Sequence, residues 1–394
     1  MIIDARQLED GIDLETDVCI VGGGAVGITI ARELRNTNLD ICVVESGGLT
    51  LEEECQALAA GETTGIRYFD LIESRFRMFG GSTYRWGARG APMKEIDFQK
   101  RLWIPYSGWP LSLKDLGPYY ERAHSLMGWH RPFYYDACVW DHFDSKPPAF
   151  DPESLQYSAF QFGKILLFGD HYRKELRTAA NVRVYLHAVV TNFQSNCSGN
   201  HLEYVDLCTL EGKKHRARAR CYVLASGGIE NPRLLLLSTN TCPRGLCNDN
   251  DLVGRFFMEH PTVSVGKIVA SDLQRVHDVF SPGLIGGRLV EVGLALSPKT
   301  QASRECCNAI ASTRPVTTCD PTQVLREVLG SLRRHKVPEK IVAGLGLVLR
   351  SPGSVLKNVG RHMLGKPKRF RMDSLNLEIR TEQEPNPDSR VTLS

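Results

Sequence analysis

The stretch from residue 17 to 48, DVCIVGGGAVGITIARELRNTNLDICVVESGG, constrains the fold more than any other part of the chain. It contains an apolar run at 18–21, a glycine-rich turn, a segment with helical spacing of apolar residues, a second apolar run at 41–44 and then Glu45. Short, uninterrupted apolar runs are typical of strands buried on both faces of a parallel sheet. The stretch therefore predicts the first β-α-β unit of a doubly wound α/β domain.

The glycines of this turn have the spacing of a dinucleotide-binding motif. Gly22, Gly24 and Gly27 match GxGxxG, in which the glycines allow a tight turn, close approach of a pyrophosphate and close packing of helix on strand. The carboxylate of Glu45 can accept hydrogen bonds from ribose hydroxyls, and the helix N-terminus favours an anion. At this stage NAD and FAD both fit, and a purely structural turn is the alternative. The predicted nucleotide-binding residues are Gly22, Gly24, Ala25, Val26, Gly27, Glu45 and Ser46.

A second informative segment, residues 77–90, has the composition of a loop that faces a cofactor. Gly80 and Gly81 permit close approach of the backbone, and the hydroxyls of Ser82 and Thr83 can donate to phosphate or ring atoms. A plain surface turn is the alternative interpretation.

A third segment, residues 221–238, begins with an apolar run at 222–225 and continues through small residues into an apolar helix. Pro232 suits the first turn of that helix. The segment predicts a strand that returns to the nucleotide-binding sheet, with Ala225, Ser226 and Gly227 beside the cofactor. One more ordinary sheet strand is the alternative.

Composition and charge describe an ordinary globular chain. Its 394 residues are 42% hydrophobic and 24% charged, enough for two domains. A net charge of +3 gives no argument for a nucleic-acid partner. The N-terminus lacks the basic and apolar regions of a secretory signal, so a cytoplasmic protein is expected. The longest apolar stretch, 341–349, is too short to span a bilayer.

The twelve cysteines predict free thiols rather than disulfides or a metal centre. No CxxC pair occurs, and Cys19 and Cys42 lie in predicted core strands, where thiols behave as small hydrophobes. The vicinal pair Cys306 and Cys307 has no Cys/His cluster near it in the sequence, so an unreactive pair is expected. We therefore predict no metal site.

Five segments, in order, resemble the glucose-methanol-choline family of FAD-dependent oxidoreductases. The GxGxxG unit with its acid is followed by GGSTYRWG (80–87), SGWPLSLKDLGPYYERAHSLMGW (107–129), VLASGGIENPRLLLLS (223–238) and LVGRFFMEHP (252–261). The tryptophan of the loop and the Ile-Glu-Asn-Pro sequence at 229–232 are similar to those of the branch that contains bacterial sugar and polyol dehydrogenases and pyranose-oxidase-like enzymes. The resemblance implies FAD, with Trp86 and Gly87 in a loop against pyrophosphate and isoalloxazine. Val190 is similar to a valine beside the adenine, although an ordinary strand valine is the alternative.

The resemblance also implies an activity. Relatives oxidise CH–OH groups of alcohols or sugars by hydride transfer to flavin N5, with various electron acceptors. Some attach FAD through a loop histidine, and residues 82–86 contain none, so non-covalent FAD is expected. Residues 377–394 resemble the strand that precedes the family's catalytic pair, a histidine with a second histidine or an asparagine. We expect this chain to lack the segment that carries the pair, so its catalytic residues are unknown. A non-catalytic or split flavin-binding protein is the alternative, and His260, His187 and His171 have little support as substitutes.

The expected architecture is a discontinuous, Rossmann-like α/β FAD-binding domain with an α+β substrate domain on an antiparallel sheet. The predicted parts are 1–110, a helical or loop excursion at 111–179 that covers the cofactor, 180–262, and an incomplete substrate domain at 263–394. Strands are expected at 263–269, 287–296 and 375–381, and a helix at 322–335. Basic residues in 333–371 fit a peripheral membrane contact or, in the favoured interpretation, a solvated face.

Overall fold

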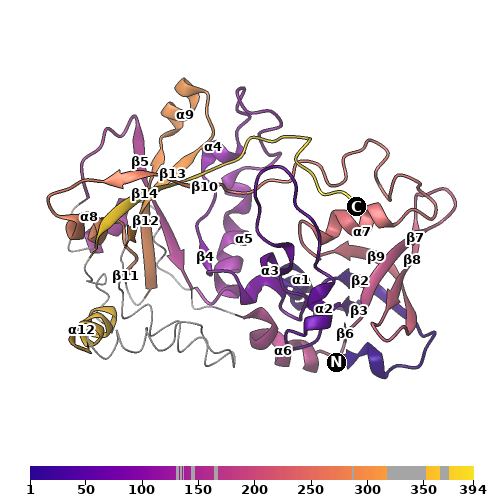
Figure 1. The fold of residues 1–394 in the computed structure, drawn as a ribbon. Coiled ribbons are helices and arrows are strands. Elements are labelled where there is room, and N and C mark those ends of the chain that lie inside the picture. The colour runs from indigo at the N-terminus through magenta and orange to yellow at the C-terminus, as the bar shows by residue number, and fades with distance from the viewer. Residues whose placement is uncertain are drawn as a thin grey trace. The chain divides into compact units, whose positions relative to one another are not determined.

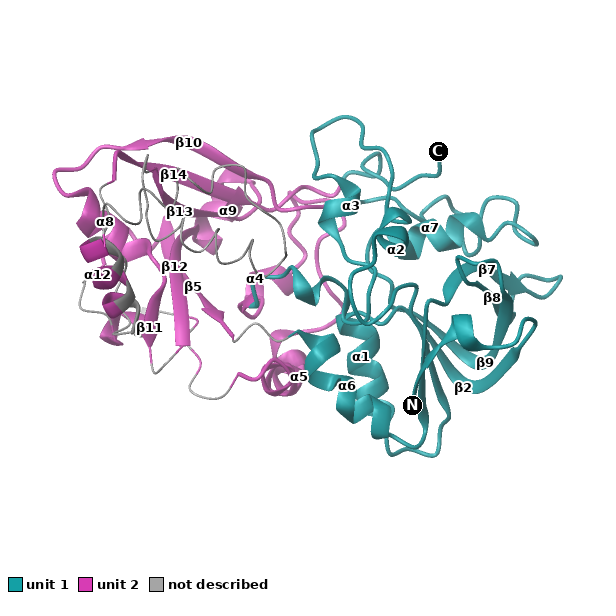
Figure 2. Cartoon of the chain, turned by 60° about the horizontal axis from the view of Figure 1, so that its bottom comes forward, with its two compact units in different colours: residues 1–88, 165–257, 386–394 teal, residues 89–164, 258–385 magenta. Residues whose placement is uncertain are grey.

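The computed structural model describes residues 1–129, 133, 135, 137–142, 147–163, 167–285, 288–316, 352–363 and 372–394. The chain divides into two compact units (Figure 2). Unit 1 comprises residues 1–88, 165–257 and 386–394, and unit 2 comprises residues 89–164 and 258–385.

Unit 1 is built on a seven-stranded sheet with the order β1-β6-β3-β2-β9-β8-β7 (Figure 1). The first five strands run parallel, and β8 and β7 continue the sheet in antiparallel pairing. The strands are β1 (Ile2–Asp4), β2 (Asp13–Val21), β3 (Ile41–Val44), β6 (Val182–Leu186), β7 (Val189–Ser195), β8 (Leu202–Cys208) and β9 (Lys214–Leu224). The helices are η1 (Ala5–Gln7), α1 (Ala25–Leu34), α2 (Glu53–Ala57), α3 (Leu71–Ser74), η2 (Gly81–Tyr84), α6 (Phe168–Thr178) and α7 (Glu230–Leu237).

The centre of this sheet is buried on both faces, as its apolar runs predicted. Cys19 and Val21 of β2 belong to the core cluster on one face, whereas the side chain of Ile20 approaches Gly27 of α1. Cys19 pairs with Cys42 of β3 in register, and both are free thiols with at most 1% of their surface exposed. The predicted mixed α/β fold is confirmed.

The returning strand is longer than its apolar run suggested. The sequence indicated residues 222–225, but β9 spans Lys214–Leu224 and pairs with β2 from Asp13 onward. Its first half alternates exposed and buried residues, because successive side chains point to opposite faces of the sheet and only one face is buried there. In a sequence, an alternation of polar and apolar residues indicates a strand less clearly than a continuous apolar run does.

Unit 2 contains the antiparallel sheet that the sequence predicted. Its order is β10-β14-β13-β12-β5-β4, and β11 pairs with β12. The strands are β4 (Arg89–Gly90), β5 (Leu155–Phe162), β10 (Thr262–Ile268), β11 (Gly283–Ile285), β12 (Arg288–Leu296), β13 (Ala309–Val316) and β14 (Ser374–Thr381). The helices are α4 (Glu95–Phe98), α5 (Leu113–Leu126), η3 (Ala137–His142), α8 (Leu273–Phe280), α9 (Pro298–Arg304) and α12 (Pro352–Met363).

The compact units differ in extent from the predicted parts. Residues 386–394 pack with unit 1 rather than with the rest of 263–394, because Arg390 forms a bridge with Arg255 and an ion pair with Asp251. The predicted excursion at 111–179 is divided between the units at residue 164. The predicted helix at 322–335 lies outside the described residues, as does the basic segment 333–371 apart from α12.

Candidate functional site

Unit 1 contains a cavity of about 640 Å³ at the carboxyl ends of β2, β3 and β9. This is the edge at which ligands bind in open α/β sheets. The cavity brings together fourteen of the residues that the sequence predicted to bind a cofactor. They are Gly22, Gly24, Ala25, Val26, Glu45, Ser46, Gly81, Ser82, Thr83, Trp86, Val190, Ala225, Ser226 and Gly227. Gly27, Gly80 and Gly87 do not line it.

The glycine turn leaves no room for side chains at two positions and is open at the third. Gly22 has φ +107°, and a Cβ there would lie 2.7 Å from the carbonyl oxygen of Ala225. A Cβ on Gly27 would lie 1.9 Å from the carbonyl oxygen of Gly22, so Gly27 lets α1 pack on the turn. A Cβ on Gly24 would meet no atom within 4 Å. Only the middle glycine therefore keeps a space clear at the cavity.

The N-terminus of α1 points its unsatisfied backbone donors toward this space. Gly24 is the N-cap and supplies no side-chain hydrogen bond, and the next two residues, Ala25 and Val26, line the cavity. The first N–H groups of a helix have no partner within the helix and attract anions. The turn thus offers an anion site without a cationic side chain.

Glu45 lies directly after β3 and is held in place by its neighbours. Its side chain is 6% exposed. The N–H of Gly23 donates to Oε2 at 2.7 Å, the N–H of Gly47 donates to Oε1 at 2.9 Å, and the Ser46 hydroxyl donates to Oε1 at 3.1 Å. A carboxylate has about four acceptor positions, so one remains for a ligand hydroxyl.

The loop around η2 packs on the glycine turn. The N–H of Gly80 donates to the carbonyl of Gly23 at 2.8 Å. The hydroxyl of Thr83 donates to the carbonyl of Gly80 at 2.6 Å, so its single hydrogen already has a partner, whereas Ser82 is exposed at the cavity wall. The indole N–H of Trp86 is buried and has no partner among the described residues. Among the residues of this loop that line the cavity, Ser82 and Trp86 are therefore the side chains with a donor available to a ligand.

The turn after β9 is fixed by Asn231. Its Oδ1 accepts from the N–H of Ser226 at 2.9 Å, and its Nδ2 donates to the carbonyl of Leu224 at 3.3 Å. The Ser226 hydroxyl donates to the carbonyl of Val21 at 3.0 Å, which ties this turn to the end of β2. The Ile-Glu-Asn-Pro sequence thus shapes the cavity wall through its asparagine.

Sequence reasoning missed a buried charge cluster in the cavity wall. Arg75 and Arg77 contact the two oxygens of Glu230 at 2.7 and 2.5 Å, and Arg77 also donates to the Ser46 hydroxyl at 3.1 Å. Burial alone would raise the pKa of Glu230, but the charges of Arg77 and Arg75 lower it overall. The Nε atoms of both arginines are buried without a partner among the described residues. The cluster adds positive charge and two unused donors to the wall.

The histidines considered from the sequence do not lie in this wall. The side chain of His260 is 70% exposed, pairs with Glu259 and belongs to unit 2. His171 is exposed on α6, and His187 is buried between Asp4 and Glu52. The cavity lining described here contains no histidine, so it supplies no imidazole base.

The donors that line the cavity fit an anionic nucleotide cofactor. Backbone N–H groups of α1 and the Ser82 hydroxyl can bind phosphates, while Glu45 can accept from ribose hydroxyls. Val190 and other apolar wall residues offer a surface for a planar ring.

The family match agrees with this geometry. The model of the DAO family, FAD dependent oxidoreductase, matches residues 17–237, which is more than half of the chain. The chain belongs to the FAD-dependent oxidoreductases, and the resemblance to the glucose-methanol-choline type is confirmed. FAD is therefore the cofactor of this class, which settles the choice between NAD and FAD.

Individual relatives are distant. The 6'''-hydroxyparomomycin C oxidase of Streptomyces lividus is 27% identical over 63% of this chain and 55% of its own. The 2-methyl-1,2-propanediol dehydrogenase of Mycolicibacterium austroafricanum is 25% identical over 62% of this chain and 55% of its own. A crystal structure of formate oxidase has a TM-score of 0.46 at 16% identity, covering 95% of this chain and 73% of that one. The chain spans about half the length of the curated relatives it matches.

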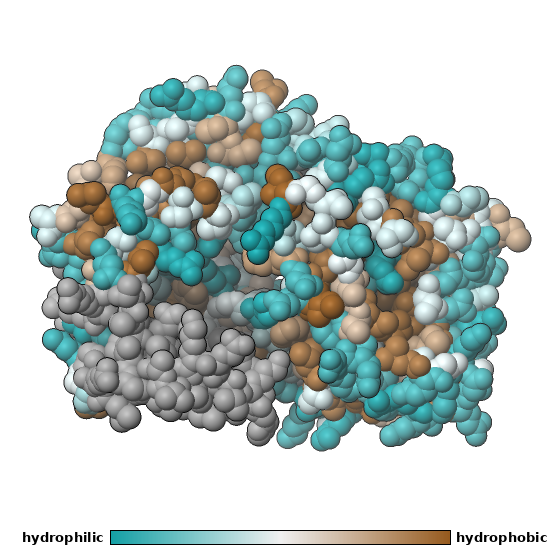
Figure 3. Space-filling view, in the orientation of Figure 1, coloured by the Kyte–Doolittle hydropathy of each residue, from teal (hydrophilic) through white to brown (hydrophobic). Residues whose placement is uncertain are grey.

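Within the described residues, no helix combines the length and the apolar character needed to cross a bilayer. On the face drawn in Figure 3, hydrophobic and hydrophilic side chains are interspersed over the described surface.

Proposed function

We propose that the unit 1 cavity holds FAD and that the chain is part of an enzyme oxidising CH–OH groups of small alcohols or sugars. The observation that carries the proposal is the convergence of three segments on one cavity. Three segments that are far apart in the sequence line this cavity: the glycine turn with Glu45, the loop at 80–87 and the turn after β9. In this proposal Gly22, Gly24 and the start of α1 bind the pyrophosphate.

The remaining assignments follow from position in the wall. Glu45, held by Gly23 and Gly47, accepts from the ribose hydroxyls. Val190, which is 8% exposed, lies where a flat apolar ring can pack. Ser82 and the unpartnered indole N–H of Trp86 donate to the remaining polar atoms of the cofactor.

The cofactor is proposed to be bound non-covalently. The described residues of the lining include no histidine, cysteine or tyrosine, the side chains that could form a bond to a flavin ring. Binding then depends on backbone donors, on Glu45 and on the arginine cluster.

Bound FAD would supply the chemistry of the oxidation by accepting a hydride from the substrate carbon. The chain's own residues bind and orient it and exclude water from the cavity. The proposed substrate class follows the printed names of the relatives, an oxidase of a paromomycin derivative and a propanediol dehydrogenase.

A non-catalytic or split flavin-binding protein is the second candidate, favoured by the lack of an imidazole in the described cavity wall. Anaerobic mixing of the FAD-loaded chain with alcohols and sugars separates the two. Loss of the oxidised flavin absorbance with one donor class supports the oxidoreductase. A fully loaded chain that dithionite reduces but no CH–OH donor reduces supports the second candidate.

A further inference from the structure

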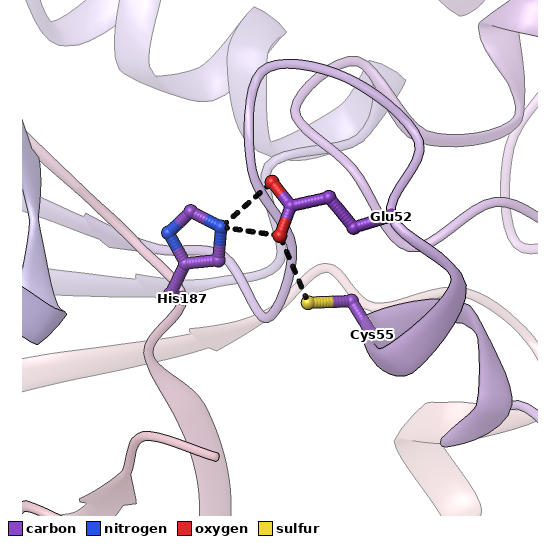
Figure 4. Close-up of side chains that lie close together, drawn as sticks. All are labelled: Glu52, Cys55 and His187. Atoms are coloured by element: carbon purple, nitrogen blue, oxygen red, sulfur yellow. Dashed lines mark hydrogen bonds and ion pairs between the residues drawn. The ribbon is translucent and has the colours of Figure 1, made fainter. Parts of the chain in front are cut away.

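A second cavity of unit 1, about 290 Å³, lies at the carboxyl ends of β1 and β6 and shares no lining residue with the FAD cavity. Its lining includes Glu52, Cys55 and His187. No sequence motif contains these three residues, because His187 lies 135 residues from Glu52. The structure nevertheless brings a carboxylate, a thiol and an imidazole together (Figure 4).

The three groups have the spacing of ligands around one small cation. Their ligand atoms all lie within 4.8 Å of one another. Nε2 of His187 is 3.0 Å from Oε1 of Glu52, and Sγ of Cys55 is 3.9 Å from Oε2. Tetrahedral Zn²⁺ with bonds of about 2.0–2.3 Å separates its ligands by roughly 3.3–3.7 Å. Shifts of about 1 Å or less in these side-chain atoms would therefore bring all three within bonding distance of one metal ion.

Local structure explains why the carboxylate and thiol share one face. Glu52 is the N-cap of α2, and Cys55 follows three residues later in its first turn. Residues three apart on a helix are neighbours on its surface. The N–H of Gln56 donates to the carbonyl of Glu52 at 2.9 Å, which fixes this turn.

The imidazole is held by a second carboxylate. Oδ1 of Asp4, the last residue of β1, lies 3.0 Å from Nδ1 of His187. An aspartate oxygen only accepts here, so Nδ1 carries a hydrogen. Nε2 donates in the same way to the carboxylate of Glu52, and it can bind a metal once it has released that hydrogen. Metal-binding histidines typically have such a carboxylate on the other nitrogen. The His187 backbone is fixed as well, since its N–H donates to the carbonyl of Gly47 at 3.1 Å.

The charges around the cavity favour a cation. Glu54 and Glu211 also line it, and Arg6 is the basic side chain of the lining. The guanidinium of Arg6 is engaged with Asp4 at 2.7 Å and lies 3.9 Å from Glu52. The three carboxylates of the lining outnumber its one guanidinium, so a bound divalent cation would offset the excess negative charge.

We propose that Glu52, Cys55 and His187 form a binding site for a zinc-class divalent cation, with the fourth ligand position open to the cavity. On binding, the thiol of Cys55 and the Nε2–H of His187 each release a proton to solvent, and the sulfur and the nitrogen bind the metal. Glu52 exchanges its hydrogen bond with His187 for a bond to the metal. Carboxylate, thiolate and imidazole together suit Zn²⁺ better than Mg²⁺ or Ca²⁺, which prefer oxygen ligands alone.

The test is zinc binding by the purified full chain, with its flavin content recorded in the same samples. After treatment with a chelator, addition of Zn²⁺ and dialysis, we expect about one zinc per chain. Cys55→Ser, Glu52→Gln and His187→Gln should each lose this zinc, whereas Cys208→Ser and Glu53→Gln should keep it. Asp4→Asn should weaken zinc binding by about 10- to 100-fold, as is typical when the partner of a ligating histidine is lost.

Co²⁺ provides a readout that distinguishes the site from surface binding. Its complex with the wild-type chain should show a thiolate-to-cobalt absorption band that disappears in Cys55→Ser while the circular dichroism spectrum stays native. Wild-type protein that retains no zinc, or zinc retained equally by Cys55→Ser and Glu52→Gln, would overturn the proposal. Either result would mean that Asp4, His187 and Glu52 form only a buried hydrogen-bonded network.

Discussion

Replacing Gly27 by alanine should damage the fold and the cofactor site together. The added Cβ would lie 1.9 Å from the carbonyl oxygen of Gly22, whereas Cβ contacts below 3.0 Å essentially never occur. Helix α1 or the turn must therefore move by about 1 Å. Gly22 cannot yield easily, because its N–H donates to Val44 at 2.8 Å and its Cα faces Ala225.

The size of the effect follows from two opposing contributions. Overpacking against backbone costs about 3 kcal/mol at the upper end of its usual range. The higher helix propensity of alanine returns about 1 kcal/mol. A net loss of about 2 kcal/mol lowers Tm by roughly 4–8 °C in a unit of this size. Thermal unfolding of the flavin-free protein measures this loss.

Gly24→Ala is the matched control, because the same methyl group meets no atom within 4 Å there and the residue has φ −81°. Its stability should stay within about 1 kcal/mol of wild type. Its FAD affinity should fall by about 10- to 100-fold, since the methyl group occupies the space proposed for the pyrophosphate. A Gly27→Ala protein with wild-type Tm and flavin content would refute the packing argument. Full FAD affinity in Gly24→Ala would refute the placement of the cofactor.

Glu230→Gln should lower the free energy of unfolding, measured with denaturant, by about 3–5 kcal/mol, because Arg75 and Arg77 would stay buried without their carboxylate. A decrease of less than about 1 kcal/mol would contradict this expectation. The pKa of Glu230 is lowered in the folded protein, so its contribution is full above the ordinary value of 4.5 and is lost as pH falls through the lowered value. The stability difference between wild type and Glu230→Gln should thus shrink on acidification, and a constant difference down to pH 3 would exclude this linkage. Ser82→Ala should weaken FAD binding with little change in Tm. Thr83→Val should lower Tm, because it removes the hydrogen bond to the carbonyl of Gly80. A lower Tm in Ser82→Ala together with an unchanged Tm and weaker FAD binding in Thr83→Val would contradict these assignments.

The parts of this molecule that the sequence predicted are those in which the signal is local. The β2-α1-β3 unit occupies one continuous stretch, and each glycine has a single geometric task within it. The loop at 80–87 and the turn after β9 were predictable for the same reason. Thr83 shows the limit of such reasoning, since a hydroxyl predicted to face a ligand donates to Gly80 instead.

The features that the sequence did not predict depend on contacts between distant residues. Arg75 and Glu230 are 155 residues apart, and only the folded sheet places both in the cavity wall. The Glu52, Cys55 and His187 cluster has the same origin, because Glu52 and Cys55 follow β3, His187 follows β6, and these two distant strands pair in parallel. No spacing within one segment could reveal either set.

The most direct test of the account is a count of the flavin bound to the purified chain after reconstitution with FAD and gel filtration. The unit 1 cavity predicts close to one FAD per chain, released into the supernatant by heat because the bond is not covalent. Folded protein that stays colourless after incubation with FAD would contradict the central claim that this cavity is the cofactor site.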